Sequence, residues 1–374
     1  MNILMLTFDY VPHPIWGMGT NVFSTVKGLR KKGHTVIVGT INRYNEKIDA
    51  ITTPCVFDVN INKNIKKCQC DIDENSCLEN LYYSIMEHIK KNEVVIDVIH
   101  CHGWMMWGVA KRISKELSTP IVATIHFVEK IYDLLGIKMN CSEDIVKRVR
   151  LTEAEMVTNA NAIICISEYC SRLLKSCYPS LQHVNIVYHG IEERQLLNKN
   201  KKDNFLFVGR LSPEKGIDQL YQIFADNPDY HLDVVGSGVL LPREDISNIS
   251  YLGSFSQSEL FEKMSTYKFV VLPYLSDLFG LVLIESISCG CIPIVSNQGS
   301  FPELMKHFSG FTFEIKNNIV NKNNVIKTLC EVRNLPLEQL DEIRLFNYSK
   351  YKELFTDEQM INGILNVYRK VVKE

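Results

Sequence analysis

Short apolar runs alternate with helical patterns along most of the chain, an arrangement typical of βαβ units and a parallel sheet. The first unit is the clearest, because residues 3–8 predict a buried strand and a loop with two prolines and two glycines follows it. Thr20 is placed to cap the next helix. The apolar face expected for that helix is Val22, Phe23, Val26 and Leu29. Gly33 then ends the helix, and residues 35–40 predict a second strand.

The same alternation divides the chain into two halves of similar size. Further strands are predicted at 94–100, 121–126, 162–166, 185–188, 205–208, 231–236, 268–272 and 292–296, with helices at 78–91, 215–226 and 280–289. Residues 43–92 are interpreted as a variable insertion, and the polar run 191–204 as a linker. We therefore expect an α/β protein of two Rossmann-like domains, residues 1–190 and 200–356, with parallel sheets that face a central, ligand-binding cleft.

Composition and charge exclude several other classes of protein. The chain has 374 residues, of which 46% are hydrophobic and 22% charged, as expected for a globular protein larger than one core. A formal net charge of −2 gives no reason to expect a nucleic-acid partner. The basic residues Lys27 and 30–32 are interpreted as a solvated helix end, so membrane contact is expected to be weak or absent. No apolar run suits a signal or a membrane span, so we expect a cytoplasmic protein with reduced cysteines.

The most informative segment runs from Asp277 to Glu285. After an acidic residue, Gly280 allows the backbone to approach a ligand closely, and a helix begins. The free N–H groups of Phe279, Gly280 and Leu281 are expected to hold a phosphate or sugar hydroxyls. Glu285 lies about two helical turns beyond Asp277, and its carboxylate is suited to accept hydrogen bonds from ribose hydroxyls.

A second segment supplies positive charge after the first strand of the second half. Arg210 can donate two hydrogen bonds to phosphate oxygens, and Lys215 adds a compact charge. Cations are unfavourable at a helix start, so their position itself favours an anionic ligand. Together they can neutralise a nucleotide leaving group, much as a metal does in other enzymes.

These two segments resemble the motifs of the retaining GT-B glycosyltransferases of family 4, including the glycogen-synthase-like members. Residues 277–285 resemble the E-x7-E signature, with Asp277 in place of the first Glu, and residues 288–295 resemble A-C-G-x-P-V-V. Residues 208–216, Val-Gly209-Arg-Leu-Ser-Pro-Glu-Lys-Gly, resemble V-G-R-L-x-x-x-K-G, in which Gly209 belongs to the donor site. The resemblance implies that Arg210 and Lys215 bind the diphosphate, Glu285 the ribose and Asp277 the sugar.

The first half carries three weaker matches to the same family. The loop Trp16-Gly17-Met18-Gly19 resembles G-G-M-G, which implies donor contact by Gly17 and Gly19, and Trp16 is a candidate for acceptor contact. Residues 97–104 resemble D-V-V-H-A-H-D-W, and His102 is weighed as an acceptor contact against simple packing. Residues 124–126 resemble T-x-H, which implies that His126 lies beside the donor sugar.

The resemblance implies a metal-independent enzyme that retains anomeric configuration and takes a nucleotide-sugar donor, expected to be a UDP-sugar. The motifs themselves do not distinguish among uridine, adenosine and guanosine as the nucleoside of the donor, and the sequence does not identify the acceptor. The resemblance further implies that a last helix at about 357–374 packs back on the N-terminal domain. Two alternatives remain open: a sugar-nucleotide epimerase or hydrolase on the same fold, and a non-catalytic GT-B partner subunit.

Other readings of the short motifs are weaker. Gly17-x-Gly19-x-x-Val22 lacks the third glycine of a dinucleotide-binding fingerprint. Asp71 and Asp73 have the D-x-D form of metal-dependent GT-A enzymes, but no strand precedes them, and an acidic loop is the better account. The cysteine spacing at 68, 70 and 77 is not a standard zinc pattern. We therefore expect no metal site.

Overall fold

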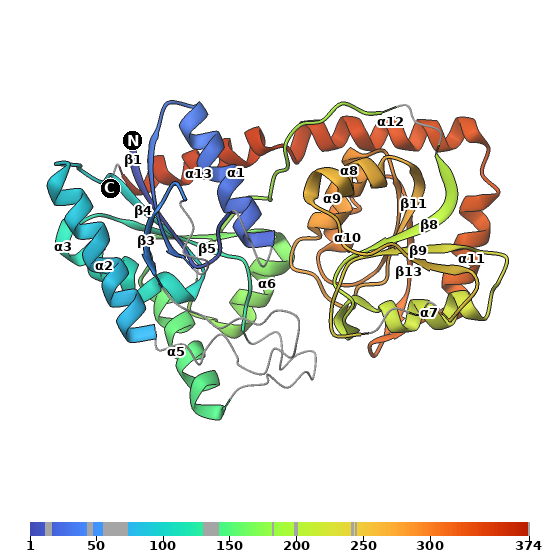
Figure 1. The fold of residues 1–374 in the computed structure, drawn as a ribbon, viewed down its shortest axis with the longest axis horizontal. Coiled ribbons are helices and arrows are strands. Elements are labelled where there is room, and N and C mark those ends of the chain that lie inside the picture. Colours follow the sequence, from blue (N-terminus) through green and yellow to red (C-terminus); the bar gives the residue numbers. More distant parts are fainter. Residues whose placement is uncertain are drawn as a thin grey trace. The chain divides into compact units, whose positions relative to one another are not determined.

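The computed structural model describes residues 1–11, 17–42, 48–54, 74–129, 142–181, 183–197, 201–240, 243 and 245–372. The chain forms two compact units (Figure 1). The N-terminal unit comprises Met1–Gly190 together with Asp357–Glu374, and the C-terminal unit comprises Ile191–Thr356. Each unit is built on its own parallel sheet.

The N-terminal unit contains a seven-stranded parallel sheet of order β3-β2-β1-β4-β5-β6-β7. Its strands are β1 (Asn2–Thr7), β2 (Thr35–Asn42), β3 (Ile51–Pro54), β4 (Val98–His102), β5 (Ile121–Ile125), β6 (Ala162–Cys165) and β7 (Asn185–Ile186). Its helices are α1 (Gly17–Lys31), α2 (Glu74–Lys91), α3 (Trp107–Leu117), α5 (Glu143–Asn159), α6 (Glu168–Cys177) and α13 (Asp357–Val371), with a short 3₁₀ turn η2 (Trp104–Met106). The central strands are buried on both faces, which explains their continuous apolar runs.

The C-terminal unit contains a six-stranded parallel sheet of order β10-β9-β8-β11-β12-β13. Its strands are β8 (Lys202–Val208), β9 (Leu232–Val235), β10 (Ile249–Tyr251), β11 (Tyr267–Leu272), β12 (Ile292–Ser296) and β13 (Phe311–Phe313), and a hairpin is formed by β14 (Ile315–Lys316) and β15 (Ile319–Val320). Its helices are η3 (Pro213–Lys215), α7 (Ile217–Ala225), α8 (Gln257–Met264), α9 (Leu281–Ser288), α10 (Phe301–Leu304), α11 (Lys322–Arg333) and α12 (Leu337–Leu354). Two parallel sheets with crossover helices confirm the predicted α/β class.

Three predicted boundaries in the chain are wrong, each for a local reason. The strand predicted from residue 94 begins at Val98, because the Val94 N–H bonds back to Ile89 O at 3.1 Å and closes α2. The predicted linker extends too far, since Lys202 N already pairs with Thr266 O at 2.7 Å as β8 begins. The first three residues of β8 are polar, two of them exposed and one half-buried, so no apolar pattern indicated a strand there.

The start of α1 also differs from the prediction. The helix begins at Gly17, so Thr20 lies inside its first turn and does not cap it. A carboxylate from the preceding loop takes that role, because Asp9 Oδ2 accepts the Gly19 N–H at 3.1 Å. Phe23, expected on the buried face, is 40% exposed.

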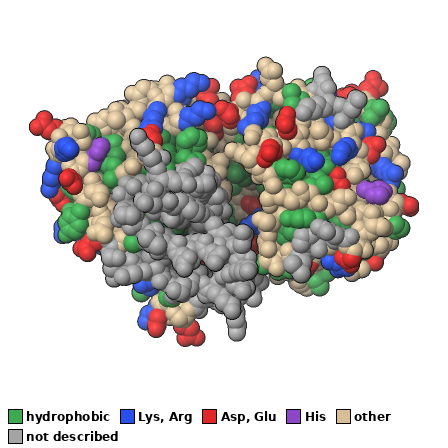
Figure 2. Space-filling model, viewed as in Figure 1, with side chains coloured by type: hydrophobic (Ala, Val, Ile, Leu, Met, Phe, Trp, Pro, Cys, Tyr) green, Lys and Arg blue, Asp and Glu red, His purple; other side chains and the backbone are tan. Residues whose placement is uncertain are grey.

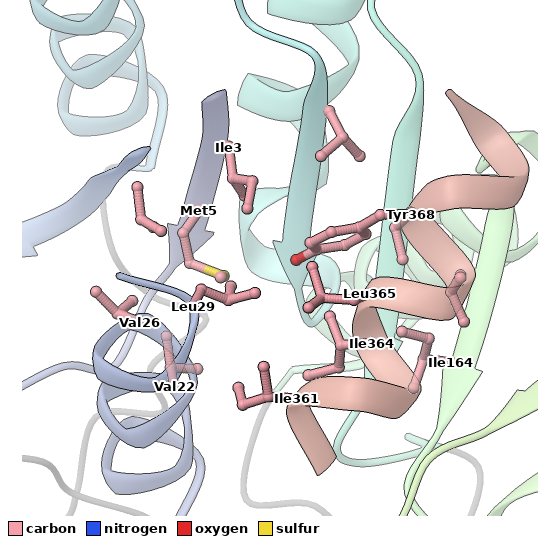
Figure 3. Close-up of a cluster of buried hydrophobic side chains, with 14 of the residues drawn as sticks. Ile3, Met5, Val22, Val26, Leu29, Ile164, Ile361, Ile364, Leu365 and Tyr368 are labelled. Atoms are coloured by element: carbon pink, nitrogen blue, oxygen red, sulfur yellow. The ribbon is translucent and has the colours of Figure 1, made fainter. Parts of the chain in front are cut away.

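The last helix, α13, completes the hydrophobic core of the N-terminal unit. Figure 3 shows its apolar side chains opposite those of α1 and β1. The cluster joins Ile361, Ile364, Leu365 and Tyr368 of α13 to Ile3, Met5, Val22, Val26 and Leu29. All of these side chains are less than 5% exposed. Residues separated by more than 300 positions thus form one core.

Gly28 permits this close approach of α13 to α1. A Cβ atom at Gly28 would lie 2.6 Å from Ile361 Cγ1 and 2.9 Å from its Cδ1. We expect Gly28→Ala to lower the free energy of unfolding, by roughly 1–3 kcal/mol as for other overpacked cores. Gly108→Ala in α3 is the matched control, because nothing lies within 4 Å of that Cβ and alanine is the better helix former by about 1 kcal/mol. Urea denaturation should shift in opposite directions for the two variants, and a more stable Gly28→Ala would contradict this packing.

Charged side chains of both signs are interspersed over the visible surface of each unit, as Figure 2 shows for the described residues. Among the described helices, none is long and apolar enough to cross a membrane. Seven described cysteines are free. Cys77 is disulfide-bonded, so the expectation that every cysteine is reduced is wrong at this position.

Candidate functional site

The candidate site of the C-terminal unit lies where the strand order of its sheet reverses. The first strand, β8, has β9 on one side and β11 on the other, so the chain continues from β8 toward one edge of the sheet and from β11 toward the other. Parallel sheets bind ligands beyond the carboxyl ends of two such strands. The loop after β8 carries residues 209–216, and the loop after β11 carries residues 273–280. Both sequence motifs therefore lie at the same point of the fold.

A salt bridge joins these two loops. Lys215 Nζ lies 2.6 Å from Asp277 Oδ2 and 3.8 Å from the centre of the Tyr274 ring. The Lys215 and Asp277 side chains are only 13% and 20% exposed. The backbones of the loops also pair, since Leu275 N donates to Glu214 O at 2.9 Å. The sequence predicted roles for Lys215 and Asp277 separately, and the structure brings them into contact.

Asp277 is held as a carboxylate by its neighbours. Burial alone raises its pKa, but the Lys215 ammonium and the N–H groups of Phe279 and Gly280 outweigh that effect and lower the pKa below its ordinary value. Both N–H groups donate to Asp277 Oδ1, at 3.0 Å and 2.6 Å. The expectation that these two amides are free for a ligand is therefore not met in this structure. Leu281, the first residue of α9, keeps an N–H that no helical carbonyl can accept.

Two glycines allow the loops to meet. Gly280 has φ 83°, and a Cβ there would lie 2.8 Å from the Phe301 ring. Gly216 has φ 65°, and its Cβ would lie 2.2 Å from Pro273 O on the facing loop. Residues with a side chain are disfavoured at such φ values, and here they would also clash. The glycines of both motifs thus serve the geometry of the loops.

Glu285 is buried in α9 and has an unusual pKa. Its side chain is enclosed (the residue is 6% exposed), and burial raises its pKa to about 7, although a hydrogen bond with Gln257 and the charge of Arg194 act in the opposite direction. The Arg194 guanidinium also covers the Phe261 ring at 3.8 Å. Sequence reasoning missed Gln257 and Arg194, which belong to α8 and to the predicted linker and carry no recognisable motif.

Arg210 stands apart from the Lys215–Asp277 pair. Its side chain is 64% exposed, and Nη2 lies 3.2 Å from Glu214 Oε1. The same oxygen accepts a hydrogen bond from Ser212 Oγ at 2.6 Å. Gly209, just before Arg210, lies under the Tyr274 hydroxyl, which a Cβ at that glycine would approach to 2.6 Å. The loop therefore presents Arg210 to solvent while Lys215 is sequestered.

The N-terminal unit has a corresponding reversal of strand order between β1 and β4. Gly17 and Gly19 lie in the first turn of α1, the helix that follows β1 along the chain, but the Gly19 N–H is already bonded to Asp9. Trp16 lies outside the described residues. His102 ends β4 and His126 follows β5, so both lie at the carboxyl edge of the sheet.

The two candidate histidines differ in burial. His102 is 1% exposed, and its ring nitrogens lie 2.8 Å from His126 Nε2 and 2.8 Å from Met5 Sδ. This burial favours the packing alternative over acceptor contact. His126 is only half-buried. His100 and His102 lie on the same face of β4, with ring centres 4.1 Å apart.

Within the described ranges, no three His, Cys, Asp or Glu side chains form a group that could hold a metal ion. The aspartates of the D-x-D pattern, Asp71 and Asp73, lie outside those ranges, as do Cys68 and Cys70.

Two Rossmann-like units, each with a reversal of strand order, define the GT-B architecture. The sucrose-phosphate synthase of Thermosynechococcus elongatus has the same fold, with a TM-score of 0.77 and 16% identity over 100% of this chain and 99% of its own. Anabaena HepE in complex with UDP and glucose gives a TM-score of 0.69 and 15% identity, over 98% and 99% of the two chains.

Family models match both units. Residues 15–195 match the model described as Glycosyltransferase Family 4, and residues 190–337 match Glycosyl transferases group 1. The chain belongs to this family of glycosyltransferases. An uncharacterized glycosyltransferase of Methanocaldococcus jannaschii is 27% identical over 77% of this chain and 79% of its own length. The glycogen synthase of Mycobacterium tuberculosis is 23% identical over 81% and 80%.

Proposed function

We propose that this glycosyltransferase takes its sugar from a nucleotide-sugar donor bound at the C-terminal unit, retains the anomeric configuration and needs no metal. The observation that carries the proposal is the Lys215–Asp277 pair at the point of strand reversal. It places a positive and a negative group together, as a donor with a diphosphate and a hydroxylated sugar requires. Binding of UDP and glucose by the Anabaena relative supports a UDP-sugar.

Lys215 can serve the diphosphate while it remains paired. Its ammonium has three N–H donors, of which Asp277 takes one, and the Tyr274 ring lies beside it. The remaining donors suit phosphate oxygens, and the exposed Arg210 can turn from Glu214 to add a bidentate contact. As the glycosidic bond breaks, these cations stabilise the charge that gathers on the leaving diphosphate.

The other groups position the sugar and the nucleoside. Asp277, held as a carboxylate, accepts hydrogen bonds from sugar hydroxyls, and the Leu281 N–H donates to the ligand. Glu285 binds the ribose, and His126 is proposed as a sugar contact at the carboxyl edge of the N-terminal sheet. We propose front-face attack, in which a phosphate oxygen of the donor helps to take the acceptor proton. The acceptor binds the N-terminal unit.

Product analysis distinguishes the proposed transfer from its alternatives. The measurement is NMR of the products formed from a UDP-hexose with and without a mixed pool of glycan and small-molecule acceptors. A glycoside with the donor's anomeric configuration supports the proposal. Free sugar or an epimer formed without acceptor would indicate a hydrolase or an epimerase, and donor binding without turnover in any pool would favour a partner subunit.

Transfer is expected to survive EDTA, because Lys215 and Arg210 are proposed to neutralise the leaving group. The assay is nucleotide release before and after exhaustive chelation, with a metal-dependent GT-A enzyme as the control for complete removal. Activity lost in chelator and restored by Mn²⁺ or Mg²⁺ would contradict the proposal and direct attention to Asp71 and Asp73.

A further inference from the structure

Tyr274 connects the loop after β11 to the end of β8 within the C-terminal unit. It is the second residue after β11 and is only 1% exposed. Its ring packs edge-on against Phe207 and at a tilt against Phe301, with ring centres 6.2 and 5.5 Å away. Its hydroxyl donates to Val208 O, the last carbonyl of β8. The ring is therefore held both by its neighbours and through its hydroxyl.

The hydroxyl of Tyr274 keeps its proton and remains a donor. Burial, and then the negative charges of Asp277 and Glu285, hold the pKa of Tyr274 well above its ordinary value. The absence of a side chain at Gly209 makes room for this hydroxyl, because a Cβ there would lie 2.6 Å from Tyr274 Oη. The ring is thus neutral and fixed in orientation over the whole physiological pH range.

One face of this ring is covered by the ammonium group of Lys215. Lys215 Nζ lies 3.8 Å from the ring centre, and its side chain is only 13% exposed. The face of an aromatic ring attracts a cation, most strongly where water is excluded. The contact therefore fixes the position of the ammonium in addition to the ion pair with Asp277.

The ring holds Lys215 without neutralising its charge. Among the described residues, Asp277 is the one hydrogen-bond acceptor of Lys215 Nζ, and an ammonium has three N–H donors. A second carboxylate in place of the ring would take another donor and make the cluster negative, which would repel a phosphate. An aromatic face adds attraction but no charge, so the cluster keeps its affinity for an anion.

We propose that Tyr274 is a positioning residue whose ring face fixes the Lys215 ammonium, so that its remaining N–H donors are presented to the phosphate oxygens of a nucleoside diphosphate. The ring contact is a property of the C-terminal unit alone, and only the assignment to a diphosphate rests on the proposed function. A ring with a weaker π face holds the ammonium less firmly, and binding must then order Lys215. Affinity for the diphosphate should therefore follow the electron density of the ring at constant volume.

The test replaces Tyr274 in the full chain by phenylalanine and by its mono-, di- and trifluorinated derivatives, which nearly conserve the size of the ring and withdraw electrons from its face. Calorimetry then gives the Kd for UDP. We expect this Kd to rise stepwise from Tyr274→Phe to the trifluorinated ring, by roughly 2- to 30-fold over the series, the range that corresponds to one cation–π contact. A purely structural role of the ring would give the same Kd throughout, which would overturn the proposal.

Tyr230 provides the matched control. Its ring also has a cation beside it, Arg333 Cζ at 5.5 Å, but it precedes β9 and so lies at the opposite edge of the sheet from the candidate site. The same series of phenylalanines at Tyr230 should leave the Kd for UDP unchanged. An equal rise in both series would show a general loss of stability and would also overturn the positioning role.

The ring contact itself is measured in the free protein by NMR of the chain labelled with ¹³C-lysine, with Lys215→Arg used to assign the signals. Protons above an aromatic face are shifted upfield, so we expect Lys215 Hε well upfield of the range for exposed lysines. An ordinary shift for Lys215 Hε would overturn the contact. Failure of UDP, ADP and GDP to bind the wild type would instead contradict the proposed function, with the ring contact still judged from the Lys215 shift.

Discussion

Lys215→Ala is expected to lower kcat by roughly 10²–10³-fold, the range for removal of one electrostatic donor from a transition state. Charge builds on the diphosphate only as the glycosidic bond breaks, so the ammonium stabilises the transition state more than the bound donor. The loss should therefore appear in kcat and kcat/KM together, whereas removal of uniform binding would raise KM alone. The measurement is nucleotide release at saturating donor with a mixed acceptor pool.

A second lysine provides the control for this experiment. Lys268 Nζ lies 2.6 Å from Asp203 Oδ1, the same distance as between Lys215 Nζ and Asp277 Oδ2. Lys268, however, belongs to the strand β11 and not to the loops of the candidate site. Lys268→Ala removes an equally short ion pair and should leave kcat nearly unchanged. Lys215→Ala also leaves Asp277 without its main partner, so near-UV circular dichroism should first show that the variant is folded. Equal turnover in wild type and Lys215→Ala would contradict the proposal that Lys215 stabilises the leaving diphosphate.

Glu285→Gln is expected to stabilise the free protein at neutral and alkaline pH. The pKa of Glu285 is raised from 4.5 to about 7. Between pH 4.5 and 7, the folded state therefore holds a proton on Glu285 that the unfolded state has lost. The contribution of Glu285 to the free energy of unfolding is therefore most favourable below pH 4.5, and it is lost as the pH rises through 7. At pH 8 the buried carboxylate therefore costs on the order of 3 kcal/mol, which Gln avoids.

Urea denaturation at two pH values tests this expectation. The variant should be clearly more stable than the wild type at pH 8 and much closer to it at pH 5. A constant difference at both pH values would contradict the raised pKa. A residue that is retained at a cost in stability is best explained by function, because perturbed carboxylates concentrate at binding and catalytic sites.

The sequence could predict the parts of the candidate site that depend on a continuous segment. Gly280 and Glu285 lie in a loop and the helix that directly follows it, so their spacing alone indicated a ligand-binding helix start. The pairing of Lys215 with Asp277 could not be read in the same way, because 62 residues separate them and the contact exists only through the adjacency of β8 and β11.

Other features escaped sequence analysis because they depend on tertiary contacts. Gln257 and Arg194 become relevant only when α8 and the start of the C-terminal unit pack around Glu285. His189 carries no motif, yet its ring stacks on His126. Helix α12, which spans 18 residues, was not predicted because it buries only Leu340, Asn347 and Tyr351, too few for an apolar period.

Donor affinity of Glu285→Gln tests the central claim most directly, namely that the C-terminal unit binds a nucleotide sugar at its point of strand reversal. A panel of UDP-, ADP- and GDP-sugars is titrated by calorimetry into wild type, Glu285→Gln and the surface control Glu331→Gln. We expect wild type and control to bind the same donor, and Glu285→Gln to lose about 1–3 kcal/mol of binding free energy, the range for a hydrogen bond to a charged group. An identical donor Kd in all three proteins would contradict the account.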